Sequence, residues 1–336
     1  MLLIDSLYIN NSGGLSLLNY LIEEIEKTDL DVVYLIDIRN KTNYNHLKEE
    51  RVIRLKANLK NRNEFYQSEQ SKFKKVLCFG NIAPPFKLSN VTVYTYLHQY
   101  FYLDSSTSKK SWFSKLKFAM KRHYFKSLAQ NTDLFVVQSH HMAEELTRVI
   151  KGTKQVQVLP FYKSTPKKFT RSKNLKDFIY VSNANPHKNH EILLDAWPEV
   201  NMHSPESVLH LTVSQEMYPS LCNRIAEMGD LNVVNHGLIS GDKVTDLLNE
   251  TEFLVYPSLA ESFGLVLIEA AQAKCKIISS HMPYVYSVVE PSLTFDPYDQ
   301  QSISDAMLIA LEGTGVSTQL KTKNDIGPML KLLASK

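Results

Sequence analysis

Short apolar runs alternate with amphipathic helical runs along this chain, and the pattern occurs twice. The runs of the first half are LLIDSLYI, DVVYLID, KVLCFG, VTVYTYLH and DLFVVQS, and those of the second half include FIYVS, FLVYPS and KIISS. Each run is nearly continuous in apolar residues, as expected of parallel strands that are covered on both faces. The alternation therefore predicts an α/β fold with two doubly wound, Rossmann-like domains facing each other across a cleft.

A basic stretch that contains a proline, FYKSTPKKFTRSKNLKD, interrupts the alternation and marks the expected domain boundary. We expect an N-terminal domain over residues 1–165 and a C-terminal domain over residues 166–336, whose last helix can pack back on the N-terminal domain. The 336 residues suffice for two domains of ordinary size. MLLIDSLYIN is interpreted as a first strand rather than a signal peptide, and no apolar run approaches the ~20 residues of a membrane span.

The distribution of charge differs between the two halves of the chain. Residues 1–165 carry 24 Lys and Arg against 15 Asp and Glu, a net charge of +9, whereas residues 166–336 carry 14 against 20, a net charge of −6. The basic half suits an anionic partner such as a membrane surface, a phosphate-bearing substrate or nucleic acid. The three isolated cysteines, Cys78, Cys222 and Cys275, indicate reduced thiols of a cytoplasmic protein rather than a disulfide or zinc set.

One glutamate lies inside an apolar stretch, LVYPSLAESFGLVLIEAAQA (254–273). Carboxylates are rarely buried unless something pairs with them. The loop SLAESFG leaves the carboxyl end of a predicted strand, where open α/β sheets bind ligands. Gly264 permits a tight turn, and a helix that begins near Leu265 would direct free backbone N–H groups at a diphosphate. Ser262, Leu265 and Glu269 are predicted to share one helix face, so that the vicinal hydroxyls of a ribose could satisfy Glu269. The alternative is a structural carboxylate that pairs with a lysine or caps a helix.

The segment PSLAESFGLVLIEAAQAKCKIISS resembles the E-x7-E signature of retaining glycosyltransferases of the GT-B fold, family 4 type (group 1). HGLISGDKVTDLLNE before it and FDPYD (295–299) after it follow the order found in that family. The resemblance implies that Glu269 holds the nucleotide ribose and that Glu261 contacts the transferred sugar. It also implies that the loop amides approach the sugar and diphosphate, and that backbone around residues 237–239 contacts the base. By this resemblance, the residues expected to bind the donor through the loop are Ser262, Phe263, Gly264 and Leu265, and those expected to contact the base are Gly237, Leu238 and Ile239.

The segment YVSNANPHKNHEILLDAW predicts a strand, a loop and a helix, with Lys188 at the end of the loop. Its ammonium could neutralise a departing diphosphate, as the lysine of the resembled family does, although a solvated loop lysine is the alternative. The arginine usual five residues earlier is Asn183 here, which donates hydrogen bonds but adds no charge. Either Lys188 and the helix terminus suffice, or a basic residue of the other domain compensates. We expect no metal and no cofactor beyond the nucleotide sugar as co-substrate, because neither His187 and His190 nor the DLD at 29–31 forms a convincing ligand set.

Two features of the first half are candidates for the acceptor side. NNSGG opens the first helix, and Gly13 and Gly14 would let backbone amides approach a phosphate, although a plain strand-to-helix turn explains them equally. His98 ends the strand VTVYTYLH. A lone histidine is more often structural, but the resemblance implies a histidine here that contacts the donor sugar.

The stretch KKSWFSKLKFAMKRHYFKSLAQ (109–130) contains seven basic residues and no acidic ones. At about 100° per residue, one apolar stripe is the expected core face; it consists of Trp112, Phe113, Leu116, Ala119, Met120 and His123. Phe118 and Phe125 are then expected to face outward, among Lys117, Lys121 and Arg122, as on a helix that lies on anionic lipid. An ordinary surface helix is the alternative, and nucleic acid is not expected because no binding motif accompanies the charge.

Together these observations predict a glycosyltransferase on the inner face of the cytoplasmic membrane. It would take a nucleotide-diphosphate sugar and a glycan acceptor linked to polyprenyl diphosphate, and it would serve bacterial surface-polysaccharide (O-antigen or capsule) biosynthesis with retention of configuration. Two other readings stay open. One is a soluble transferase of the same fold that acts on a protein or small molecule, and the other is a non-catalytic module that binds sugar nucleotides.

Overall fold

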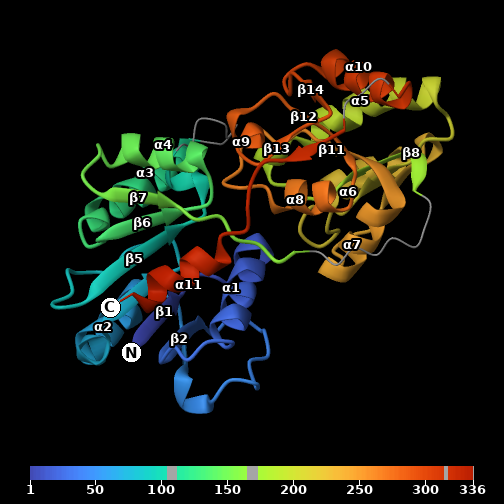
Figure 1. Ribbon diagram of the computed structural model, residues 1–336. Coiled ribbons are helices and arrows are strands. Elements are labelled where there is room, and N and C mark those ends of the chain that lie inside the picture. The colour runs from blue at the N-terminus through green and yellow to red at the C-terminus, as the bar shows by residue number, and fades with distance from the viewer. Residues whose placement is uncertain (104–111, 165–172, 314–316, 336) are drawn as a thin grey trace. The chain divides into compact units, whose positions relative to one another are not determined.

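The computed structural model describes residues 1–103, 112–164, 173–313 and 317–335, without the side chains of Ser12, residues 112–115 and Lys117. The described chain divides into two compact units (Figure 1). Unit 1 runs to Lys163 and takes up the chain again from Lys323, and unit 2 runs from Ser164 to Thr322. In the described part of the chain, none of the helices combines the length and the apolar character needed to cross a bilayer.

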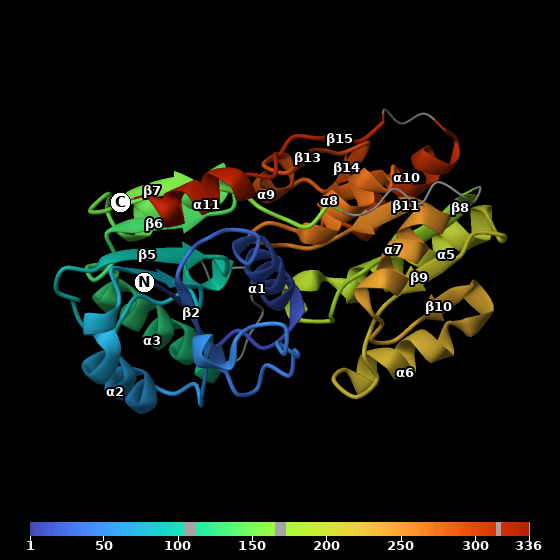
Figure 2. The same cartoon turned by 60° about the horizontal axis from the view of Figure 1, so that its bottom comes forward.

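Unit 1 is built on a parallel sheet with the strand order β3-β2-β1-β4-β5-β6-β7. The central strands are buried along their whole length because helices cover both faces, which explains their continuous apolar sequences (Figures 1 and 2). The strands are β1 (Leu2–Ser6), β2 (Val32–Asp37), β3 (Val52–Leu55), β4 (Lys75–Cys78), β5 (Thr92–Leu97), β6 (Leu134–Val137) and β7 (Gln155–Val158). The α-helices are α1 (Ser12–Ile25), α2 (Leu59–Glu69), α3 (Trp112–Ala129), α4 (His140–Val149) and α11 (Ile326–Ala334).

Unit 2 is built on a second parallel sheet with the order β10-β9-β8-β11-β12-β14. Its core stacks Phe178 on Phe253, with ring centroids 4.9 Å apart, and sets Trp197 edge-on to Phe178 at 5.8 Å. The strands are β8 (Asn174–Tyr180), β9 (Leu209–Leu211), β10 (Val233–Asn235), β11 (Thr251–Tyr256), β12 (Lys276–Ser280) and β14 (Leu293–Phe295), with a separate antiparallel pair of β13 (Val289–Glu290) and β15 (Gln319–Leu320). The α-helices are α5 (His190–His203), α6 (Pro219–Glu227), α7 (Gly241–Glu250), α8 (Leu265–Gln272), α9 (Pro283–Tyr286) and α10 (Gln300–Leu311).

Both sheets are doubly wound, as the sequence predicts, and each has one point at which the strand order reverses. The reversal lies between β1 and β4 in unit 1 and between β8 and β11 in unit 2. Connections that leave neighbouring strands in opposite directions open a crevice at the carboxyl ends, where such sheets bind ligands. Functional residues are therefore expected in the loops after β1, β4, β8 and β11.

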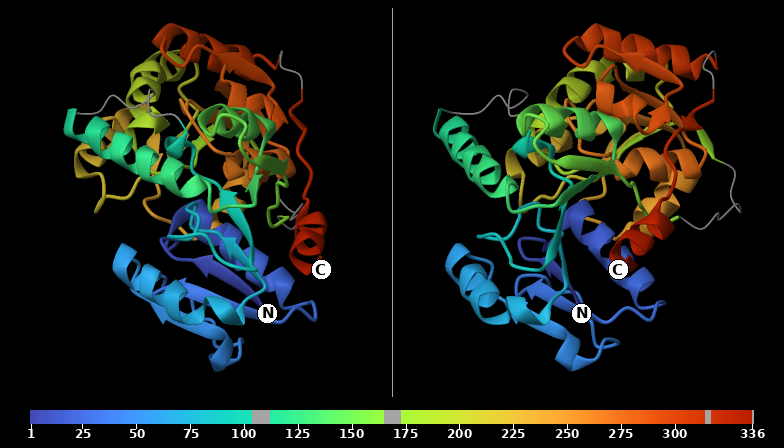
Figure 3. Two further views of the ribbon diagram at one scale, coloured as in Figure 1. Left: turned by 90° about the vertical axis from the view of Figure 1, so that its left-hand side faces the viewer. Right: turned by 60° about the vertical axis from the view of Figure 1, so that its left-hand side comes forward.

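The C-terminal helix α11 belongs to unit 1, where it lies beside α1 (Figures 1 and 3). The segment before it is fixed by hydrogen bonds within that unit. The Asp325 N–H donates to the Pro160 carbonyl at 2.7 Å, and the Asn324 amide donates to the Tyr162 carbonyl at 2.7 Å and to the Tyr20 hydroxyl at 3.1 Å. The chain therefore returns to the first unit after completing the second.

The orientation of α3 is opposite to the one that the sequence predicts. Phe125, expected on the outer face, is 1% exposed and packs in a core with Leu97 and Phe135. Phe118 is half-buried and lies against the ring of Phe101, with centroids 5.8 Å apart.

The expected core stripe of α3 is instead the outer face, where Leu116 is 50% and Met120 62% exposed. Ala119 and His123 are exposed on the same face, whereas the side chains of Trp112, Phe113 and Lys117 lie outside the described ones. Lys121 is exposed and sits 5.8 Å from the ring centroid of Phe118, and Arg122 is half-buried. The helix carries apolar residues on both sides, so its periodicity did not determine which side packs on the sheet.

Candidate active site

The two candidate catalytic residues of unit 2 are in direct contact. Lys188 ends the short turn after β8, and its ammonium forms an ion pair with the Glu261 carboxylate in the loop after β11. The same carboxylate oxygen accepts hydrogen bonds from the Ser258 hydroxyl at 2.7 Å and the Tyr256 hydroxyl at 3.0 Å. The two loops that meet here leave the strands on either side of the reversal point.

Charge and burial act in opposite directions on Glu261. Burial by itself would raise the pKa of this carboxyl. The charges of Lys188 and His187 and the hydrogen bonds from Lys188 and Ser258 outweigh burial, so the pKa lies below its ordinary value. Glu261 is therefore an ionised, preorganised acceptor that cannot serve as a proton donor near neutral pH.

Glu269 differs from Glu261 in its surroundings, although the two residues are close in the sequence. It projects from α8, and its carboxylate makes no hydrogen bond or ion pair with any residue that the structure describes. Burial without a compensating charge raises its pKa from 4.5 to about 7. A half-buried carboxyl without a partner is costly in the folded protein, which favours a ligand as its partner over the structural alternative.

A glycine in a left-handed conformation directly precedes α8. Gly264 adopts a left-handed conformation, with φ of 75°, and no side chain caps the helix that begins at Leu265. A Cβ at Gly264 would meet the Leu267 side chain at 3.0 Å, so both space and backbone favour glycine. Ser262 precedes this turn and does not share a helix face with Glu269, which corrects the expectation from spacing. Phe263, between them, is buried.

The loop after β8 carries the remaining donor-side residues. The Asn183 Oδ1 accepts the side-chain amide of Asn185 at 2.9 Å, so the residue that replaces the usual arginine is part of a local turn. Asn189 has φ of 61° and starts α5, and its amide joins two loops by donating to the carbonyls of Pro297 at 2.7 Å and Pro257 at 3.3 Å. His190 is buried against the Tyr180 ring, and its burial lowers its pKa to about 3, which makes it a core residue.

The segment expected to contact the base follows β10. Gly237 has φ of 69°, Leu238 is 82% exposed and Ile239 is half-buried. The neighbouring His236 makes a contact that the sequence did not suggest. Its Nε2 is 3.0 Å from Nδ1 of His210, and Nε2 of His210 is in turn 3.3 Å from an Asp177 carboxylate oxygen.

In unit 1 the structure brings two predicted residues together, because a Cβ added to Gly14 would lie 2.8 Å from Cε1 and 3.4 Å from Nδ1 of His98. Gly13 is exposed at the start of α1. Burial lowers the pKa of His98 to about 4, so its imidazole is neutral at physiological pH.

Asn81 is a site residue that the sequence reasoning missed, although it lies in the loop after β4, at the reversal point. Its Oδ1 accepts the backbone N–H of His98 at 2.7 Å, which turns its amide nitrogen toward His98 Nε2 at 3.1 Å. The Phe79 carbonyl lies 3.1 Å from the same ring nitrogen. The Asn81 amide nitrogen can only donate to Nε2, so we assign Nε2 as the acceptor and the ring proton to Nδ1, beside Gly14.

Among the residues that the structure describes, no three His, Cys, Asp or Glu side chains gather as a metal site requires. Lys188 and Glu261 are in contact in unit 2, where Glu269 lies on the helix that follows the Glu261 loop, and Gly14, His98 and Asn81 lie together in unit 1.

Two doubly wound units, with polar residues gathered at the reversal points of both sheets, define the GT-B class of protein. Residues 162–326, almost half of the chain, match the family model described as "Glycosyl transferases group 1". An uncharacterised glycosyltransferase of Methanocaldococcus jannaschii is 23% identical over 162 residues, which are 48% of this chain and 44% of that protein. The serotype-specific mannosyltransferase WbdA of Escherichia coli is 30% identical over 116 residues, 34% of this chain and 14% of that protein.

Solved structures extend the likeness of fold to the whole chain. Sucrose-phosphate synthase from Thermosynechococcus elongatus aligns with a TM-score of 0.71 at 16% identity, covering 99% of this chain and 98% of that one. WaaG, a glycosyltransferase involved in lipopolysaccharide biosynthesis, aligns with a TM-score of 0.68 at 11% identity, covering 93% and 90%. At these identities the structures establish the fold alone. The curated relatives match over less than half of their own length.

Proposed function

We propose that the chain is a glycosyltransferase that moves a sugar from a nucleotide-diphosphate sugar to a glycan, with retention of configuration at the anomeric carbon. The observation that carries the proposal is the contrast between two glutamates of unit 2. Glu261 is held ionised by Lys188, whereas Glu269 has no partner among the described residues and a pKa of about 7. Two vicinal ribose hydroxyls would give Glu269 the hydrogen bonds that the protein does not supply.

The arrangement supplies what departure of a nucleoside diphosphate requires. Lys188 and the uncapped start of α8 would stabilise the negative charge that develops on the leaving phosphate. Phosphate oxygens compete with Glu261 for the Lys188 ammonium, so donor binding would free the carboxylate to accept hydroxyls of the sugar. Ser258 and Tyr256 would keep Glu261 in place during this exchange. We propose no covalent nucleophile and no metal, so activity in EDTA should equal activity with added Mg²⁺.

We place the acceptor on unit 1, where Gly13 and Gly14 open α1 beside His98. The neutral Nδ1–H of His98 would donate a hydrogen bond to a sugar or phosphate oxygen. The net charge of +9 over residues 1–165 suits an acceptor that carries a diphosphate, and we propose a polyprenyl-diphosphate-linked glycan of a bacterial surface polysaccharide. The names of WbdA and WaaG support that context.

We propose that the protein works on the inner face of the cytoplasmic membrane, with the corrected outer face of α3 toward the lipid. Leu116 and Met120 are exposed there, near the exposed Lys121 and Lys126. Flotation with vesicles containing anionic phospholipid should recover the wild type and lose Leu116→Ser/Met120→Ser. Equal recovery of both would favour the alternative of a transferase that acts on a protein or small molecule in solution.

Calorimetric titration with UDP, GDP, ADP and dTDP, and with their sugars, tests the donor assignment. One nucleotide should bind to the wild type and bind at least tenfold more weakly to Glu269→Gln, because the amide replaces one of the two acceptor oxygens. Retention of full affinity in Glu269→Gln, or binding of none of these nucleotides, would refute the assignment.

A non-catalytic sugar-nucleotide-binding module is the second candidate, because Asn183 stands where the resembled family has an arginine and its side chain bonds to Asn185 in the same loop. Product analysis by mass spectrometry separates the two. A transferase consumes the donor and loses this activity in Glu261→Ala, whereas a binding module shows no turnover with either protein.

A further inference from the structure

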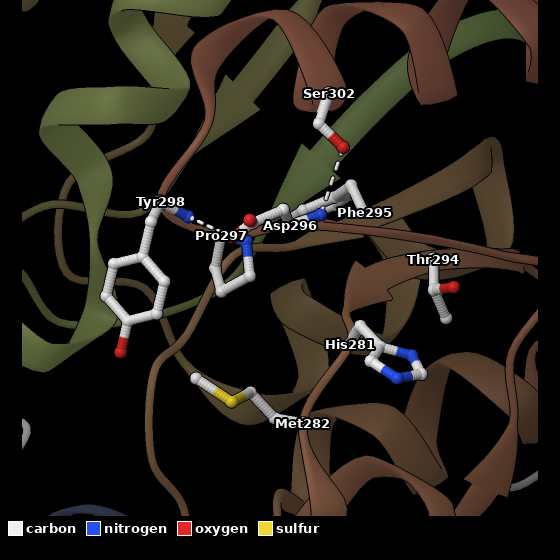
Figure 4. A pocket seen from close by; sticks show the side chains of 8 residues that line it. All are labelled: His281, Met282, Thr294, Phe295, Asp296, Pro297, Tyr298 and Ser302. Carbon is white, nitrogen blue, oxygen red and sulfur yellow. Dashed lines mark hydrogen bonds between the residues drawn. The ribbon is translucent and has the colours of Figure 1, made fainter.

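A cavity of about 430 Å³ lies within unit 2, outside the donor site described above (Figure 4). Its walls come from His281 and Met282, which follow β12, from residues 294–298 around the end of β14, and from Ser302 of α10. The cavity therefore opens at the carboxyl ends of the parallel strands β12 and β14, of which β12 lies next to β11. Its volume is that of a small-molecule site and accommodates a single sugar ring.

The lining combines apolar surfaces with hydroxyl, imidazole and carboxylate groups. Tyr298 is 61% exposed, and Pro297 and Met282 lie near it in the cavity wall, whereas Thr294 and His281 lie toward the other end in the view of Figure 4. An exposed tyrosine ring offers a flat apolar surface with a polar edge. The aliphatic face of a pyranose fits such a surface.

Asp296 determines which class of ligand suits the cavity. Its Oδ1 accepts the backbone N–H of Tyr298 at 2.9 Å, which fixes the side chain, and its Oδ2 makes no bond with a described residue. The Ser302 oxygen accepts the Asp296 N–H at 3.0 Å, and its hydroxyl proton has no acceptor among the residues that the structure describes. An anchored carboxylate accepts hydroxyl groups and repels phosphate, so the lining suits a neutral polyhydroxyl ligand.

Hydrogen bonds connect this cavity to the residues that would hold the donor. Asn189, next to Lys188, donates to the carbonyl of Pro297 in the cavity wall at 2.7 Å. On the other side, the Ser280 hydroxyl, adjacent to His281, donates to the Ser258 carbonyl at 2.8 Å. Because Ser258 also bonds Glu261, the cavity and the proposed sugar-transfer site share two structural connections within one unit.

From this geometry we infer that the cavity is a saccharide subsite that holds one sugar ring of the glycan acceptor in unit 2. The role in the acceptor rests on the proposed transferase function, whereas sugar binding itself does not. A ring stacked on Tyr298, with hydroxyls bonded to Asp296 Oδ2, would hold part of the growing glycan close to the transfer site.

Saturation-transfer NMR with the methyl α-glycosides of mannose, glucose and galactose tests the subsite directly. At least one glycoside should bind the wild type, with its ring protons close to the protein. Tyr298→Ala should weaken that binding about tenfold, and Asp296→Asn should weaken it comparably. Met217→Ala is the matched control, because Met217 is 61% exposed in the same unit and outside the cavity.

Nucleotide titration of the same variants separates this inference from the proposed function. Tyr298→Ala should bind nucleotide with wild-type affinity, and in a transfer assay it should raise the KM for the acceptor about tenfold with the donor KM unchanged. Equal glycoside binding by wild type, Tyr298→Ala and Asp296→Asn would overturn the subsite. Loss of nucleotide binding in Glu269→Gln with glycoside binding intact would support both assignments. Glycoside binding by a wild-type protein that binds no nucleotide would support the subsite but refute the proposed transferase function.

Discussion

Replacing Glu269 by glutamine should stabilise the protein at neutral and alkaline pH. Burial raises the pKa of Glu269 from 4.5 to about 7. Below pH 4.5 the carboxyl is protonated in both the folded and the unfolded chain, so it imposes no penalty. Between pH 4.5 and 7 the unfolded chain releases this proton while the folded protein retains it, so stability falls as the pH rises, and the loss is complete above about pH 7. The shift of about 2.5 pH units corresponds to at most about 3 kcal/mol, of which roughly 2.5 kcal/mol is lost between pH 5 and pH 8.

Urea unfolding of the wild type and Glu269→Gln at pH 5 and pH 8 measures this loss. The difference between the two proteins should grow toward pH 8 in favour of the variant, and the control Glu227→Gln, an exposed carboxylate of α6, should follow the wild type. Nucleotide binding should reverse the effect, because ribose hydroxyls stabilise the ionised form. Affinity should then rise with pH between 5 and 8 in the wild type and stay flat in Glu269→Gln.

An unfolding free energy whose pH dependence is the same in wild type and Glu269→Gln would refute the reasoning. It would mean that the carboxyl finds a partner or water in the folded protein. A pH-independent nucleotide affinity in the wild type would separately contradict the proposed contact with ribose.

Asn81→Asp should move the ring proton of His98 from Nδ1 to Nε2 and raise the pKa of His98 above about 4, because a carboxylate only accepts hydrogen bonds. Two-dimensional ¹H–¹⁵N NMR distinguishes the two tautomers, and the same tautomer in the wild type and the variant would contradict the assignment. Lys188→Met should lower the transfer rate at least 100-fold and destabilise the fold, since it leaves the charge of Glu261 without its ion-pair partner. The double variant Lys188→Met/Glu261→Gln should regain stability against urea but not activity, and regained activity would exclude the lysine from the chemistry. Phe125→Ala should lower the free energy of unfolding in urea by about 3–5 kcal/mol and leave vesicle binding of the folded protein unchanged. A loss under 1 kcal/mol would indicate that Phe125 faces outward after all.

The sequence by itself determined the two doubly wound units, and it singled out Lys188 and Glu261, which the structure brings into contact at the reversal point of unit 2, but not Asn81 in unit 1. Central parallel strands are buried on both faces, so their burial is written locally as continuous apolar runs, and the spacing of Glu261 and Glu269 is likewise a local signal. The edge strands β3 and β7 went unrecognised. Half-exposed residues alternate with exposed ones along QVQV, and such an edge has no continuous apolar run to detect.

Only the tertiary structure decided which side chains meet. The face of α3 depends on packing against Leu97 and Phe135, which lie on strands before and after it in the sequence, and helical periodicity alone offered two apolar faces. The same holds for the contact of Asn81 with His98 and for the cavity beside Tyr298, since each joins segments that follow different strands. Periodicity records whether an element is buried, whereas the partner of a polar group is fixed by a fold that brings distant residues within hydrogen-bonding distance.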